Sequence, residues 1–167
     1  SSELRLGHVN FGANSTIRLD GGSYVHAAGM SAASAALLTV SHSDDLVEID
    51  GDLKLGNSLA ITASGIGSTF KLGGAFSFDF TDETQLELRN STVHLVGSGP
   101  DQNIEAGGQD VGAAVSFLSN ENFGFGQMIV GQEGQPTIVR LRDAIDNGNH
   151  NDINGHREAL YLFGVEG

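Results

Sequence analysis

The chain has 167 residues, the length of one domain, with 24 Gly, 2 Pro and no Cys or Trp. Lys and Arg number 8 against 21 Asp and Glu, which gives a formal net charge of -13. The lack of Cys excludes disulfides and Cys-ligated metals, and the negative charge disfavours nucleic acid, whose phosphates need basic partners. No apolar run reaches the length of about 18 residues that suggests a membrane span.

Short alternating phrases recur along the chain, each with one residue, usually a charged one, between two apolar ones, and most have Gly, Asn or Asp close behind. In chain order they are LRLG (4–7), IRLDG (17–21), VEIDG (47–51), LKLG (53–56), LAI (59–61), FKLG (70–73), FSFDF (76–80), LELRN (86–90) and VHLVG (93–97). A period of two predicts short strands with one buried and one wet face. No stripe of period 3.6 accompanies them, so the chain is predicted to be all-β.

Two longer phrases are repeated. NSTIRLDGG (14–22) returns as GSTFKLGG (67–74), and STIRLDGGSYVH (15–26) returns as TQLELRNSTVH (84–94). The second of these two repeats places His26 and His94 at matching positions, which indicates that they are structurally equivalent and do not form a metal site. Repeated short phrases favour a parallel β-solenoid, because the inward side chains of every coil must stack in the same way on those of the next coil.

At about 20 to 24 residues per coil, the chain would make about seven coils. The alternative is an antiparallel β-sandwich or jelly roll, which also uses many short strands. Asp50 and Gly51 lie between two alternating runs, as in a two-residue hairpin turn, and would support that alternative.

The phrases NSTIRLDGG, GSTFKLGG and EIDGDLKLGNSLAI resemble repeats of bacterial autotransporter passenger domains and of related secreted proteins with autotransporter-associated β-strand repeats. The C-terminal stretch RLRDAIDNGNHNDINGHREALYLFGVEG looks like a segment near the end of such repeats. The resemblance implies a right-handed parallel β-helix, export to the extracellular space or bacterial cell surface, and a structural or adhesive role. It carries over no catalytic residues.

Residues 1–167 are interpreted as a single solenoid segment. The chain begins without an initiator Met or signal peptide and stops within an apolar run, so we expect a fragment of a longer secreted chain. A polar loop at 143–158 is expected to be inserted between strands.

This loop, DAIDNGNHNDINGHRE, is rich in oxygen ligands that suit Ca²⁺. The candidate ligands are Asp143, Asp146, Asp152 and Glu158. His150 and His156 could favour Zn²⁺ with a carboxylate instead. A solvated loop, with Asn and Gly serving its turns, is the simpler interpretation.

Other side chains raise the question of glycan chemistry. The carboxylates that could pair across a sugar are Asp44, Asp45, Asp79, Asp82 and Glu83. Phe76, Phe78 and Phe80 alternate and are expected to be core ladders, but facing outward they could stack on sugars. We expect no enzymatic activity, with a polysaccharide lyase or hydrolase as the alternative.

Both ends of the chain carry strand-like apolar phrases. The residues expected to form an interface are Leu4, Leu6, Leu160, Leu162 and Phe163. Unblocked solenoid ends expose strand edges that invite pairing. The sequence therefore predicts an extracellular structural or adhesive solenoid that binds copies of itself or flanking coils of its parent chain. A carbohydrate-binding β-helix that contacts surface glycans is the alternative.

Overall fold

The computed structural model describes residues 2–12, 14–32, 36–56, 59–63, 67–99, 101–108, 123–148 and 158–166. Within these ranges the protein is all-β, with one 3₁₀ turn, η1 (Glu83–Gln85), and no α-helix. The strands are β1 (Ser2–Phe11), β2 (Ser15–Leu19), β3 (Ser23–Ala32), β4 (Ala36–Val40), β5 (Leu46–Ile49), β6 (Leu53–Leu55), β7 (Leu59–Ala63), β8 (Thr69–Leu72), β9 (Phe76–Phe78), β10 (Leu86–Leu95), β11 (Gln102–Glu105), β12 (Gly124–Val130), β13 (Val139–Arg142) and β14 (Tyr161–Glu166). No helix in this part of the chain is long and apolar enough to cross a membrane.

The strands build a β-solenoid with three walls, and all of their ladders are parallel. The first wall stacks β1, β3, β5, β8, β10, β12 and β14. The second wall stacks the later halves of β1 and β3 with β6, β9, β11 and β13. The third wall stacks β2, β4, β7 and the start of β10.

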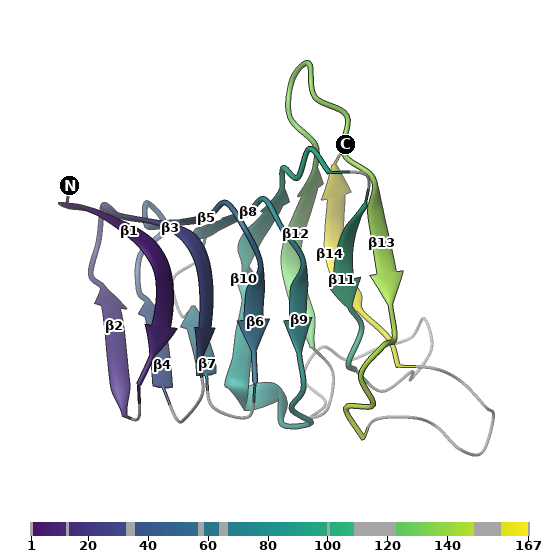
Figure 1. The fold of residues 1–167 in the computed structure, drawn as a ribbon, viewed down its shortest axis with the longest axis horizontal. Coiled ribbons are helices and arrows are strands. Elements are labelled where there is room, and N and C mark those ends of the chain that lie inside the picture. Colours follow the sequence, from purple (N-terminus) through teal and green to yellow (C-terminus); the bar gives the residue numbers. More distant parts are fainter. Residues whose placement is uncertain are drawn as a thin grey trace.

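The winding is right-handed. In Figure 1 the chain descends through the near strands β1, β3, β6 and β9 and ascends through the far strands β2, β4 and β7 while it advances from the N-terminus. This is the hand preferred by parallel crossovers built from right-twisted strands. The prediction of a right-handed parallel β-helix is therefore confirmed.

The antiparallel alternative is wrong. Among the described residues, antiparallel pairing is limited to two isolated bridges, Gly108 with Ala159 and Gln132 with Gln135. Asp50 and Gly51 do not close a hairpin, because β5 belongs to the first wall and β6 to the second. The Asp-Gly step instead turns the chain at a corner between walls.

The expected count of about seven coils was too high for complete turns. Seven strands stack in the first wall, but the third wall holds only four in the described ranges, so about four turns have all three sides. The early coils have the expected length of about 20 to 24 residues. Residues paired between neighbouring coils are one coil apart, and Val47 pairs with Phe70 and Phe70 with Val93. Val93 then pairs with Met128, and Met128 with Val165, so the last coils take more chain.

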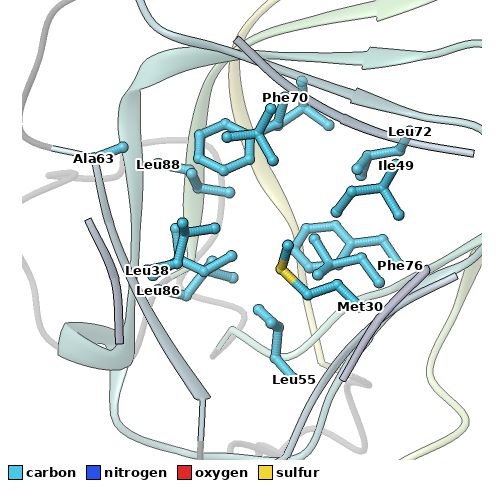
Figure 2. Close-up of a cluster of buried hydrophobic side chains, with 14 of the residues drawn as sticks. Met30, Leu38, Ile49, Leu55, Ala63, Phe70, Leu72, Phe76, Leu86 and Leu88 are labelled. Atoms are coloured by element: carbon cyan, nitrogen blue, oxygen red, sulfur yellow. The ribbon is translucent and has the colours of Figure 1, made fainter. Parts of the chain in front are cut away.

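The core is a set of stacked inward side chains, and Figure 2 shows them converging from the three walls. The first-wall ladder consists of Leu4, Val25, Val47, Phe70, Val93, Met128 and Val165. The second-wall ladder consists of Val9, Met30, Leu53, Phe76, Ile104 and Leu141. Burial of these apolar side chains is the main force that holds the coils together.

The two repeated phrases of the sequence differ in how their copies are placed in the solenoid. The shorter one links β2 of the third wall to β8 of the first wall, so its two copies share a local pattern but not a position in the coil. The longer one is a true equivalence. His26 and His94 lie in one outward row of the first wall, and Ile17 and Leu86 lie in one ladder of the third wall.

Candidate functional site

Three carboxylates meet at the edge of the second wall. Glu105 ends β11, Asp143 directly follows β13, and Glu158 precedes the bridge between Ala159 and Gly108. One carboxylate oxygen from each of the three lies within 4.8 Å of the other two. Glu105 and Glu158 are buried, with 4% and 6% exposure, and Asp143 is half-buried.

The local backbone fixes Glu105. Its Oε1 accepts hydrogen bonds from the backbone N–H groups of Ala144 and Ile145 at 2.8 and 2.9 Å. Burial raises the pKa of the Glu105 carboxyl above its ordinary value, and the negative charge of Asp143 adds to this, while the two N–H groups oppose it. The cluster therefore concentrates negative charge at a place where water screens it poorly.

Three carboxylates could supply part of the coordination of a hard divalent cation such as Ca²⁺, which takes six to eight oxygen ligands. The cluster contains two of the four predicted ligands, Asp143 and Glu158. Asp146 is not among the three clustered residues; it accepts a hydrogen bond from the N–H of Gly148 at 2.9 Å, as turn residues do. Asp152, His150 and His156 lie outside the described residues.

Glu105 was missed by sequence reasoning. It lies 38 positions before Asp143, so no local spacing connects them. Only the register of β11 on β13, which pairs Glu105 with Arg142, brings it beside the start of the polar loop. A solenoid register worked out from the repeats would have been the signal needed.

The polar loop is also fastened to an earlier coil. Asn147 is buried and donates hydrogen bonds from Nδ2 to the carbonyl oxygens of Phe78 and Phe80 at 3.0 and 3.1 Å. The hydroxyl of Thr81 donates to the carbonyl oxygen of Asn147. Residues 143–148 are therefore held against β9 as well as β11, which gives the carboxylate cluster a fixed frame.

The two end coils form a second candidate site. The exposed large apolar side chains of the described residues are Leu4, Ile138, Leu141 and Val165. Leu4 and Val165 are the two ends of the first-wall ladder, and Leu141 ends the second-wall ladder. Ile138 directly precedes β13. Apolar exposure therefore coincides with the places where the stack of coils stops.

The predicted interface residues occupy these end coils. Leu4 is exposed, Leu6 is half-buried, and Leu160 and Leu162 are half-buried and pack against the core. Phe163 lies in β14, and its side chain is outside the described part. Sequence reasoning missed Val165 and Leu141, because only the ladders show that they are end residues.

The residues that suggested glycan chemistry have mostly structural surroundings. Asp45 is buried and accepts backbone hydrogen bonds from Ser23 and His42, each at 3.0 Å. Asp82 caps Thr84 through a backbone N–H bond of 2.9 Å. The predicted core ladder of Phe76, Phe78 and Phe80 is confirmed, since all three are buried.

Comparison with protein-family models, with curated proteins and with solved structures gave no match. The fold and these two sites therefore carry the functional argument.

Proposed function

We propose that the protein is a structural β-solenoid of the secreted, adhesive kind whose end coils bind further β-coils. The observation that carries the proposal is that, among the residues the structure describes, the exposed large apolar side chains are confined to the two end coils. Such side chains lose contact with water when another coil stacks on them, and each buried leucine or valine contributes about 1.5–3 kcal/mol.

The backbone at these ends supports the same proposal. In the described structure β1 pairs with β3, β13 with β11, and β14 with β12, so each has one edge that no described strand covers. An uncovered edge offers a row of N–H and C=O groups to an incoming strand. Flanking coils of a longer chain or another copy of this chain would satisfy them equally.

The sides of the solenoid have a different character. Outward positions of the first wall carry His26, Glu48, Lys71 and His94, and the chain as a whole is strongly acidic. Polar lateral positions and a high net negative charge keep a rod soluble and oppose side-by-side aggregation. Together with the resemblance to autotransporter repeats, this supports an extracellular location and a role as a spacer or adhesive rod.

The test is sedimentation velocity and negative-stain microscopy across a concentration series of the 167-residue chain. We expect mass to rise with concentration and the particles to lengthen at constant width. Val165→Lys should suppress this growth, whereas Thr62→Lys, which adds the same charge on the third wall, should not. Particles that stay short and monodisperse at every concentration would disprove the proposal.

The carbohydrate alternative has less support. Buried Phe side chains offer no face on which a sugar could stack, and Asp45 serves the backbone. Asp44 and Asp79 are exposed and stay available for a glycan-binding wall. Glycan-array binding by the monomeric Val165→Lys variant would revive this alternative, because its lateral walls are intact.

A further inference from the structure

We propose that two copies of the chain stack head to tail, with β1 of one copy pairing on β14 of the other and continuing the register of the first wall. This inference rests on the proposed function and names both the partner, a second copy, and the geometry of the contact. Three features of the two end coils complement one another.

The first feature is the apolar ladder. Its last member, Val165, is 62% exposed and its first member, Leu4, is 46% exposed. If the register continues, Leu4 of the following copy lies directly on Val165, as Met128 does from the coil below. In the second wall the ladder ends one coil earlier, at Leu141 of β13, so Val9 of the following copy would lie two strand spacings above Leu141 and not directly on it. The translation thus covers the end of the first-wall ladder, Val165.

The second feature is charge. The outward row of the first wall consists of Arg5, His26, Glu48, Lys71, His94, Ile129 and Glu166. Continuing this row places Arg5 of the following copy opposite Glu166, a cation opposite an anion.

The row already contains one such pair inside the molecule. Glu48 and the Lys71 of the next coil form an ion pair of 2.6 Å, with the carboxylate on the earlier coil and the cation on the later one. Glu166 and Arg5 would have the same order. Glu3, which forms an ion pair with Arg5 at 2.5 Å, would stand opposite Gly164, so the register sets no acidic side chain against it.

The third feature is shape. An open hollow of about 840 Å³ lies at the C-terminal end between the 131–137 loop, the end of β12 and Glu166. Figure 1 shows this loop extending above the ends of β12 and β14. Residues 6–7 of the following copy, which turn β1 from the first wall to the second, would lie over this hollow. Gly7 is uncrowded, with nothing within 4 Å of an added Cβ.

The charge pair gives the first test, with association followed by sedimentation. Arg5→Glu and Glu166→Arg should each weaken self-association by about tenfold, because each sets two like charges opposite one another. An equimolar mixture of the two variants should associate like the wild type, since unlike charges then face one another at every contact. Lys54→Glu makes the same charge change on an exposed lateral site and should have little effect.

A cysteine pair gives the second test, and the chain has no Cys of its own. Strands in register are about 4.8 Å apart, within the Cα separation that a disulfide allows. A mixture of Leu4→Cys and Val165→Cys chains should form a disulfide-linked dimer under mild oxidation. Arg5→Cys mixed with Val165→Cys should not, because these side chains point to opposite faces of the wall.

The outcomes separate this inference from the proposed function. A wild-type chain that never associates contradicts both. Association that survives Arg5→Glu as well as it survives Lys54→Glu, or that yields Leu4→Cys homodimers instead of the mixed dimer, overturns the head-to-tail register. In that case the end coils still bind β-coils, but in another geometry.

Discussion

At Glu105 a single substitution can separate the effect of the side chain's charge from the effect of its shape. Glu105→Gln keeps an oxygen that can accept from Ala144 and Ile145 but removes one of three clustered negative charges. We expect the variant to be more stable at neutral pH in chelator, by about 1 kcal/mol or about 2–4 °C in Tm. Glu87→Gln, the same change at an exposed lateral position, is the control. Thermal unfolding of the three proteins is the measurement.

A cation would reverse this order. If the cluster holds Ca²⁺, millimolar Ca²⁺ raises the Tm of the wild type because a ligand that binds the folded state stabilises it, and chelator removes the gain. Glu105→Gln should lose most of the Ca²⁺-dependent shift. A Ca²⁺ effect of equal size in both proteins would place the cation elsewhere and contradict the role of Glu105.

The carboxylate of Glu48 makes the stability of the folded protein depend on pH. Its hydrogen bond with Lys71, and next the one from the Tyr24 hydroxyl, lower the pKa of its carboxyl in the folded state. A folded pKa below the unfolded one means a stability contribution that is present above the ordinary pKa of about 4.3 and is lost as pH falls through the folded pKa. Urea midpoints of wild type and Glu48→Gln should therefore differ at pH 7 and converge below about pH 4.

The control again is Glu87→Gln, whose difference from the wild type should not follow this pattern. A gap between wild type and Glu48→Gln that stays constant from pH 7 to about pH 3 would show that Glu48 acts by packing and not by charge.

The members of the candidate sites could be predicted from the sequence only where they lie close together along the chain. Asp143 and Glu158 could be proposed from one polar loop, but the third carboxylate enters from a strand 38 positions earlier. The same holds for the ion pair of Glu48 and Lys71, which are neighbours only because β5 and β8 stack. Contacts between coils depend on register, and the sequence phrases alone leave that register open.

At the scale of the elements, glycine sets how closely two coils approach. Gly73 and Gly74 follow β8 at a corner, directly against the corner of the preceding coil. A Cβ on Gly74 would lie 2.3 Å from the carbonyl carbon of Gly51, and backbone atoms cannot move aside as a flexible side chain can. The same close approach of backbone explains the glycines that end the phrases at Gly51, Gly73 and Gly97, whereas Gly7 and Gly56 have no such close neighbour.

Gly74→Ala should therefore be destabilising, by about 1–3 kcal/mol, as overpacking usually is. Gly99→Ala is the matched control, because nothing lies within 4 Å of a Cβ there. Urea denaturation of both variants is the measurement. Equal midpoints would mean that the corner can widen and that close approach is not required.

The strands themselves were the most predictable elements. Alternation placed Leu53, Leu55, Phe76 and Phe78 inside, and all four are buried. The assignment of strands to walls was not predictable, because an inward-outward-inward triplet followed by a turn fits any side of the coil. That is why NSTIRLDGG and GSTFKLGG resemble each other in sequence but lie in different walls.

For the whole molecule, a repeat pattern predicts a solenoid but not its length. Dividing the chain by the early coil length assumes that every coil is equally long, and the last two are not. Thr92 lies 35 residues before its first-wall neighbour Gln127, whereas Thr69 lies only 23 before Thr92. The extra residues of these coils carry no repeat signal, so the length of the coils becomes apparent only from the register of the strands.

Ionic strength should control assembly at this scale. With a net charge of -13, two copies repel one another, and salt screens that repulsion over a Debye length of about 10 Å at 0.1 M. We expect end-on association to strengthen several-fold between about 10 and about 150 mM NaCl, measured by sedimentation. Arg5→Glu and Lys54→Glu carry equal net charge, so the difference between them isolates the Glu166 contact, and it should shrink as salt rises. Association that weakens steadily from the lowest salt would show that local ion pairs, and not burial of the ladder ends, dominate the contact.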